Sequence, residues 1–407
     1  MGSSKSKKFA LVLSGGGFLG AFQVGALQQL KENWASLNPE NPMMKFDIVA
    51  GVSVGALNGL LVASDRLDEL NEYWEDIAQN GVEEIYTSDF IDTRSQNETI
   101  QFKLSLESIR KKLFPGLNLG SISFWQWVKI LFSKNKEQKV LDKIGPLIIN
   151  ELKTHLPGFK SITDNTPLRK KLMHLAKRDR IVECIFKCGY VSLNDGAYYS
   201  LKHNEFDSDQ DFALGILAST VMPIVFPPVK EVLTKYLENE KHENLVDGGV
   251  RNVSPLGDVI REIQKEGNTN TEYTIIIINC SDGNIQQTNF SDKNIAQIAL
   301  RSLANIAITE IFNHDIKEFV DKNFILKQIK ELAPEAKIRD YDYYKDQPGK
   351  HLKIFNAIII QPANHLGDSL VATRKLIDER KNHGKEKALE AILEYTRPDR
   401  DQDFIIV

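Results

Sequence analysis

The chain has 407 residues, 42% of them hydrophobic and 26% charged, a composition typical of a globular protein with a deep core. Its 51 basic and 55 acidic residues give a net charge of −4 with no sustained basic stripe, which argues against nucleic acid as the main partner. Three cysteines are too few for a disulfide framework and are typical of a reducing compartment.

Residues 1–8 are polar and basic, and no long apolar core follows them, so we expect no signal peptide here. We interpret these residues as a disordered basic start. The same residues match the pattern for N-myristoylation of Gly2 next to lysines. Gly2 directly precedes the first expected strand, so such a lipid would lie at the opposite edge of the sheet from a site at the strands' carboxyl ends. We predict a cytoplasmic protein, with a peripheral membrane location as the alternative.

The next residues alternate between strand and helix patterns. Short apolar runs at 9–13 and 46–51 are each followed by helical spacing, at 21–34 and 54–63. This alternation indicates an α/β core with a mainly parallel sheet. Further apolar runs predict buried strands at 185–193, 273–279 and 354–360.

Four other segments complete the organisation of the chain. Residues 83–165 are charge-rich and helical in propensity, and we interpret them as an insertion or lid over the core. Residues 212–229 contain no charge over 18 positions, but three prolines make a buried helix with a following turn the preferred interpretation over a membrane span. Residues 296–332 and 366–393 are predicted to be mainly helical.

The first candidate site is the glycine block Gly15-Gly16-Gly17-Phe18-Leu19-Gly20, between a strand and a helix. It satisfies the dinucleotide fingerprint G-x-G-x-x-G, which also needs an acidic residue at the end of the next strand. That strand ends instead in Gly51-Val52-Ser53-Val54-Gly55, a G-x-S-x-G sequence. Such a turn presents its serine at a helix N-terminus, where developing negative charge is favoured.

A serine nucleophile needs a base. His314 and His365 come late enough in the chain to complete a triad, although their local sequence marks neither of them. Asp247 is the better candidate, because apolar residues precede it and Gly248 and Gly249 follow it. A structural aspartate that caps a turn is the alternative interpretation of the same pattern.

Together these blocks resemble the patatin-like phospholipase family. The resemblance rests on SGGGFLGAFQVGAL, on GVSVG, on LASTVMPIVFPPV at 217–229 and on LVDGGVRNVSPL, which occur in the family's order. It implies a three-layer α/β/α fold with a mainly parallel central sheet, a helical insertion and a C-terminal α/β extension. The implied domains are a catalytic domain at 9–262, interrupted by 83–165, and a C-terminal portion at 263–407 that completes or flanks the sheet.

The resemblance further implies a Ser–Asp dyad, with Ser53 as the nucleophile and Asp247 as the proton acceptor. Bare backbone amides of Gly15, Gly16 and Gly17 can then form the oxyanion hole. Gly20, Gly51, Gly55, Gly248 and Gly249 are the other glycines of the motifs. Leu19 departs from the family pattern, which usually has Arg or Lys at that position, and this puts substrate preference in doubt.

The expected function is therefore hydrolysis of fatty-acyl esters, of the phospholipase A or lysophospholipase type, without a metal or another cofactor. The alternatives are a weakly active lipid-binding or regulatory protein, for which Leu19 is the reason, and a nucleotide-binding module. The expected partner is a lipid or a membrane surface. Trp125, Trp127 and Phe132 belong to an aromatic stripe that fits either interfacial contact or lid packing.

Overall fold

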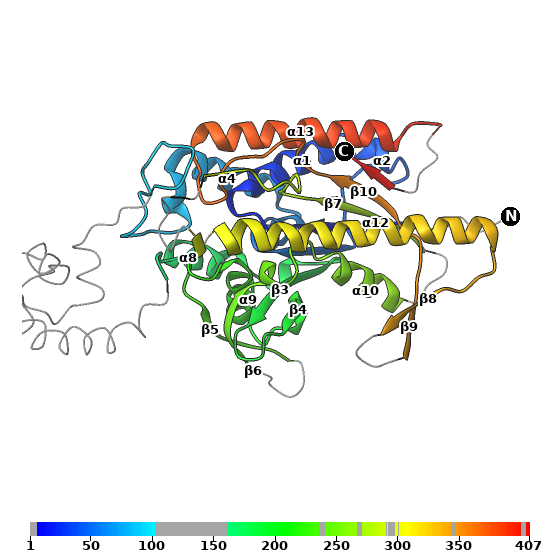
Figure 1. The fold of residues 1–407 in the computed structure, drawn as a ribbon, viewed down its shortest axis with the longest axis horizontal. Helices are drawn as coiled ribbons and strands as arrows, with labels where there is room; N and C mark the ends of the chain where they lie inside the picture. Colours follow the sequence, from blue (N-terminus) through cyan, green and yellow to red (C-terminus); the bar gives the residue numbers. More distant parts are fainter. Residues whose placement is uncertain are drawn as a thin grey trace, which may run out of the picture.

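The order of the strands in one large sheet determines where the site lies. We describe a computed structural model of the chain over residues 6–101, 161–235, 241–266, 271–289, 291, 298–299, 301–342, 347–399 and 404–407. Within these residues, a nine-stranded sheet has the order β11-β10-β7-β1-β2-β3-β6-β5, with β4 paired to β3. Figure 1 shows β7 and β10 beside each other, and β3, β4, β5 and β6 together in another part of the sheet. Its strands are β1 (Ser6–Leu13), β2 (Ile48–Val52), β3 (Ile185–Ser192), β4 (Tyr198–Lys202), β5 (Val229–Leu233), β6 (Lys241–Asp247), β7 (Thr271–Ile278), β10 (Asn356–Ile360) and β11 (Phe404–Ile406).

The sheet is parallel from β11 to β3 and antiparallel where β4, β5 and β6 join it. Three of its strands, β7, β10 and β11, come from the C-terminal portion of the chain and extend the sheet beyond β1. A separate hairpin pairs β8 (Arg339–Asp342) with β9 (Gln347–His351). The predicted α/β class with a mainly parallel sheet is confirmed.

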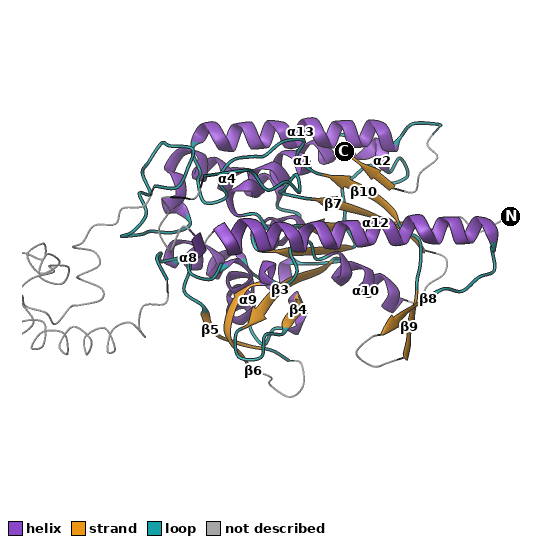
Figure 2. Cartoon of the chain, viewed as in Figure 1, coloured by secondary structure: helices purple, strands orange, loops and turns teal. Residues whose placement is uncertain are grey.

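Helices cover both faces of the sheet, because the central strands are apolar on both sides (Figure 2). Leu11 and Leu13 of β1 face one core, whereas Ala10 and Val12 face the other. The first core is shared with α1 (Gly20–Glu32), α2 (Trp34–Leu37), α3 (Val54–Ala63), α4 (Leu67–Asn80), α8 (Thr166–Leu175), α9 (Asp209–Thr220) and α13 (Arg374–Tyr395). The second is shared with α10 (Leu256–Glu266) and α12 (Ile308–Leu332).

Two sequence-based boundaries differ from the structure by more than two residues. Strand β1 begins at Ser6 rather than Phe9, because Ser6, Lys7 and Lys8 pair in register with Thr271–Tyr273 of β7. The helix expected from Leu366 begins only at Arg374. Gly367 has a φ of +85° and the Asp368 carboxylate accepts the amide of Leu370, so residues 366–373 form a loop that ends at the helix cap Thr373.

The uncharged segment at 212–229 behaves as predicted. It contributes most of α9, then a turn, and then the start of β5. Among the helices that the structure describes, none is both long and apolar enough to cross a bilayer. Residue Gly2 and the aromatic stripe with Trp125, Trp127 and Phe132 lie outside the described residues, as does most of the expected insertion at 83–165.

Candidate active site

Ser53 occupies the tight turn between β2 and α3. Its backbone angles are φ 56° and ψ −128°, a conformation that few residues other than glycine adopt. A Cβ atom on Gly51 would lie 2.1 Å from the carbonyl oxygen of Gly55, and a Cβ atom on Gly55 would lie 2.2 Å from that of Leu13. The two motif glycines therefore permit the sharp turn, and the backbone strain is concentrated at the serine that the turn presents.

This strain predicts an unusual order of stabilities for two variants that both lack the hydroxyl. Ser53→Gly should be more stable than Ser53→Ala by about 1 kcal/mol or more, because glycine adopts a positive φ without a Cβ clash. Urea unfolding of the two purified variants measures the difference. An alanine variant as stable as the glycine variant would show that the turn stores no strain at this position.

Asp247 is the last residue of β6, and the sheet register brings it level with Ser53. Val52 of β2 pairs with Gly189 of β3, and the next residue of β3, Tyr190, pairs with Asp247. Asp247 is 5% exposed, and its carboxyl lies close enough to the Ser53 side chain for the serine to act on the pKa of the carboxyl. It also accepts the amide of Gly249 at 2.7 Å. An antiparallel strand thus places a carboxylate beside a serine that follows a parallel strand.

Burial dominates the electrostatics of Asp247. Loss of solvation raises the pKa of its carboxyl from 3.8 to about 7, while the hydrogen bonds from Ser53 and Gly249 act in the opposite direction. A carboxyl with a pKa near neutrality exchanges protons readily at physiological pH. The pair therefore has the proton affinity that a general base needs to act on a serine hydroxyl.

The glycine block forms the loop between β1 and the 3₁₀ helix η1 (Gly17–Leu19), next to Ser53. A Cβ atom on Gly15 would lie 3.3 Å from Ser53 Cβ, so this loop and the serine are in direct contact. The amide of Gly15, however, donates to the carbonyl oxygen of Val253 at 3.0 Å. The expectation that Gly15 supplies an oxyanion donor is therefore not met, because its N–H is already used.

Gly16 and Gly17 retain their donors. Among the described residues, neither amide has a hydrogen-bond acceptor. Gly17 has a φ of +56°, and a Cβ atom there would lie 2.4 Å from the carbonyl oxygen of Ser369, so only glycine fits this position. Of the other motif glycines, Gly20 begins α1 against Val54, and Gly248 and Gly249 begin the 3₁₀ helix η6 (Gly248–Val250) directly after Asp247.

Ser219 is a site residue to which the sequence analysis gave no role. It lies near the end of α9, fully buried, and its Oγ accepts the amide of Ser53 at 3.0 Å. This bond stabilises the strained turn. Because the amide of Ser53 already donates to Ser219, it is not available to an oxyanion. The only signal in the sequence was its place in the LASTVMPIVFPPV block, which carried the family resemblance but no chemistry of its own.

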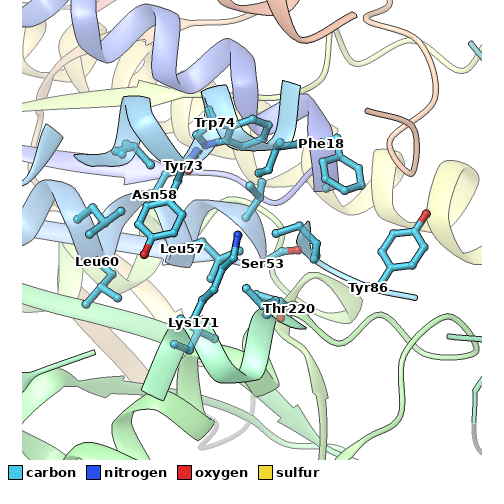
Figure 3. Close-up of a pocket in the computed structure, with 18 of the residues that line it drawn as sticks. Phe18, Ser53, Leu57, Asn58, Leu60, Tyr73, Trp74, Tyr86, Lys171 and Thr220 are labelled. Carbon is cyan, nitrogen blue, oxygen red and sulfur yellow. Dashed lines mark hydrogen bonds between the residues drawn. The ribbon is translucent and has the colours of Figure 1, made fainter. Parts of the chain in front are cut away.

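Two cavities meet at Ser53. The first has an almost wholly apolar lining and extends along α3 past Leu57 and Leu60 (Figure 3). Leu61 also lines it. Helix α4 contributes Tyr73 and Trp74 to the same wall. Since an α-helix rises 1.5 Å per residue, the stretch of α3 from Ser53 to Leu61 spans about 12 Å. This shape fits a single extended hydrocarbon chain.

The second cavity has a more polar lining, and both Asp247 and Ser53 line it. Residues of the C-terminal portion supply much of its wall, including Asp282, Arg301 and Asn305. Ser53, Gly17, Thr220 and Ser369 line both cavities. The serine hydroxyl therefore stands where an apolar chamber opens into a polar one.

Among the described residues, neither of the two histidines considered as bases is hydrogen-bonded to Ser53. His365 lines the second cavity, but its Nδ1 accepts the amide of Gly367 at 3.0 Å. His314 is an exposed residue of α12, 3.7 Å from Glu318. Within the described part of the chain, no group of three His, Cys, Asp or Glu side chains is placed to hold a metal ion.

Comparison with known proteins gives the family of the chain. The family model for patatin-like phospholipases matches residues 11–260, more than half of the chain. No curated protein matches the chain. Among solved structures it is similar to VipD from Legionella pneumophila, at 14% identity and a TM-score of 0.37, over 100% of this chain and 72% of VipD. It is also similar to the type III effector protein ExoU, at 12% identity and a TM-score of 0.30, over 97% of this chain and 54% of ExoU. The chain belongs to the patatin-like phospholipase family, a family of lipid hydrolases.

Proposed function

We propose that this protein hydrolyses the fatty-acyl ester bonds of phospholipids or lysophospholipids through an acyl-enzyme formed on Ser53. The observation that carries the proposal is the buried Asp247 carboxyl beside the Ser53 side chain, where the two cavities meet. The serine is held in a strained turn, and two unpaired glycine amides adjoin it. These are the parts that nucleophilic acyl transfer requires.

In the first half of the reaction, Ser53 Oγ attacks the ester carbonyl carbon as its proton moves to the Asp247 carboxylate. The carbonyl oxygen becomes an oxyanion, which the amides of Gly16 and Gly17 stabilise. The tetrahedral intermediate collapses as the ester C–O bond breaks, and the leaving alcohol takes the proton from Asp247. The products of this half are the acyl-enzyme and an alcohol that carries the head group.

In the second half, a water molecule replaces the alcohol. Asp247 takes a proton from the water as its oxygen attacks the acyl carbon, and a second oxyanion forms on the same two amides. Collapse breaks the bond to Ser53 Oγ, which recovers its proton from Asp247. The fatty acid leaves and both dyad residues return to their starting states.

The two cavities divide the substrate between them in this proposal. The apolar cavity along α3 takes the acyl chain. Its lining has almost no polar surface, so it offers no partners to a polar head group and favours a hydrocarbon chain over water. The chamber that contains Arg301 and Asn305 takes the leaving group. Family membership supports the lipid class, and the apolar wall supports a fatty-acyl group in particular.

A product analysis tests the proposal as a whole. The protein is incubated with vesicles of phosphatidylcholine that has different acyl chains at its two positions, and in parallel with lysophosphatidylcholine and with triacylglycerol. Mass spectrometry of the released fatty acids should show release from the first two lipids in excess chelator. Binding of the vesicles without release would instead support the weakly active lipid-binding alternative, and binding of immobilised nucleotide would support the nucleotide-binding one.

The acyl-chain assignment gives a further prediction. Leu61 is buried in α3 at the far part of the apolar cavity, so Leu61→Phe should shorten the space for the acyl chain. We expect kcat/KM for long-chain esters to fall on the order of tenfold, with little change for acetyl or butyryl esters. Leu393→Phe, on the exposed surface of α13, is the matched control. An equal loss for short and long chains would refute this placement of the acyl chain.

A further inference from the structure

Helix α13 carries an arginine that is almost completely buried. Arg380 is 1% exposed, and it makes four hydrogen bonds, all of them to backbone carbonyl oxygens. Among the described residues, no carboxylate is hydrogen-bonded to its guanidinium, and the Asp368 carboxylate acts on it only at longer range. A buried cation without a bonded counter-ion is costly unless its donors are satisfied, and here they are satisfied by the ends of peptide dipoles.

Three of the four carbonyls belong to the loop 366–373. Nε donates to Leu366 at 2.9 Å, Nη2 to Asp368 at 2.9 Å and Nη1 to Val371 at 2.9 Å. Residues of this loop line both cavities beside Ser53. The guanidinium therefore holds together a loop that lines the site, and it pairs the carbonyls of Leu366 and Val371. The carbonyl of Asp368 also accepts the amide of Val371 at 3.3 Å.

The fourth carbonyl is that of Phe18, in the glycine block. Arg380 Nη1 donates to Phe18 O at 3.3 Å, and the amide of Phe18 donates to Ser369 O at 2.8 Å. Both backbone groups of Phe18 are thus fixed from the C-terminal side of the chain. Phe18 directly follows Gly17, which has a φ of +56° and lies so close to the same Ser369 carbonyl that a Cβ atom would not fit. The conformation of the loop with the two free amides depends on these contacts.

Close helix packing brings Arg380 to this place. Helices α1 and α13 lie side by side, although they are far apart in the sequence (Figure 1). A Cβ atom on Gly25 of α1 would lie 1.8 Å from the backbone oxygen of Lys381, and one on Gly384 would lie 2.0 Å from that of Phe22. The backbones can approach so closely only because both positions are glycine, and α1 begins directly after the glycine block.

The charge of Arg380 persists in this environment. Burial lowers the pKa of its guanidinium to about 10, which leaves it protonated at neutral pH. The Asp368 carboxylate lies close enough to the guanidinium to favour its charged form, and Cys280, whose Cβ packs against Gly16, is a second neighbour. A positive charge beneath the glycine loop favours negative charge on the other side of it.

From these contacts we infer that Arg380 is the positioning residue of the oxyanion loop. Its guanidinium holds the loop 366–373 and, through Phe18 and Ser369, the segment that contains Gly16 and Gly17. The inference rests on the proposed function, because an oxyanion loop matters only if acyl transfer occurs. Residue 380 lies outside the residues matched by the family model, so the C-terminal portion contributes to catalysis as well as to the sheet.

The test compares Arg380→Ala with Arg374→Ala, a 47%-exposed arginine on the same helix. Steady-state hydrolysis of a fatty-acyl ester is measured together with the affinities for two inhibitors. One is a trifluoromethyl ketone, which forms an oxyanion on the serine, and the other is a non-hydrolysable ether analogue. We expect Arg380→Ala to lower kcat on the order of 100-fold and to weaken ketone binding in parallel. KM and ether binding should stay within about threefold, and ethylguanidinium should restore part of kcat.

Arg380→Lys keeps the charge with fewer donors, and its kcat should fall between those of the wild type and Arg380→Ala. If the alanine variant does not fold, kcat and the two inhibitor affinities of Arg380→Lys are compared with those of Arg374→Ala instead. A wild-type kcat in both Arg380 variants would overturn the inference, as would an equal loss of ketone and ether binding without rescue, which is the result expected of a purely structural residue. Either result would leave the proposed function intact, because the wild type would still hydrolyse the ester. Absence of Ser53-dependent hydrolysis by the wild type would instead overturn the proposed function and this inference with it.

Discussion

Replacement of Ser53 by alanine is expected to lower kcat for acyl-ester hydrolysis by about 10⁴- to 10⁶-fold. The variant lacks the nucleophile, and the remaining glycine amides and cavities can give only the small rate enhancement that comes from binding and oxyanion stabilisation. Fatty-acid release from phospholipid vesicles measures the rate, and a fluorophosphonate probe reports whether a reactive serine is present. Both signals should fall to background together.

A second serine variant controls for this result. Ser36→Ala replaces an exposed serine of α2, which does not line either cavity, and should keep both the hydrolysis and the labelling of the wild type. The Ser53→Ala protein should also remain folded, because alanine occupies no more volume than serine. Undiminished labelling of folded Ser53→Ala would place the nucleophile elsewhere.

Asp247→Asn is expected to lower kcat on the order of 10⁴-fold while the folded structure is retained. The amide can accept the N–H of Gly249 and can hydrogen-bond with Ser53, but it cannot take a proton. In the wild type, kcat/KM should rise with pH through about 7, since the carboxyl is active only when ionised and burial raises its pKa to about 7. Unimpaired turnover in Asp247→Asn would refute the dyad.

The same substitution should make the protein more stable above neutral pH. The pKa of Asp247 is 3.8 in the unfolded chain and about 7 in the folded one, so the unfolded state gives up its proton first as pH rises. Stability that is fully present below pH 4 is therefore lost on the way to pH 7, by up to about 4 kcal/mol. Asparagine has no proton to lose, and Asp247→Asn should not show this decrease.

Urea unfolding at pH 5 and at pH 8 measures this effect. The other titratable groups are common to the two proteins, so the difference between them isolates Asp247. The variant should gain stability relative to the wild type between the two pH values. A difference that does not change with pH would show that the carboxyl is not buried as described.

The sequence identified the local chemistry because the turn that presents Ser53 is encoded within five residues. Gly51 is needed by a contact inside that turn, with the carbonyl of Gly55, whereas Gly55 is needed because the turn packs against Leu13 of β1. The two apolar segments beside the turn define the strand and the helix. The buried helix at the start of 212–229 and the apolar central strands were predictable for the same reason. Their patterns reflect neighbours that are close in the chain.

The sequence was less reliable where long-range contacts decide the outcome. The start of β1 at Ser6 depends on pairing with β7, more than 260 residues away. The Gly15 amide is occupied by Val253, and the loop at 366–373 is held by Arg380 and by Tyr86, whose hydroxyl donates to Leu370 O. None of these partners can be recognised from a local pattern, because each comes from a different element.

By itself, the sequence determined the α/β class, the strained serine turn and a carboxylate with glycines after it. Only the tertiary structure decided which groups meet. The register of an antiparallel strand sets Asp247 level with Ser53, and the packing of α13 on α1 places Arg380 beneath the glycine loop. The physical reason is that a local sequence fixes dihedral angles and apolar faces, whereas distances between distant residues depend on how the whole sheet and its helices pack.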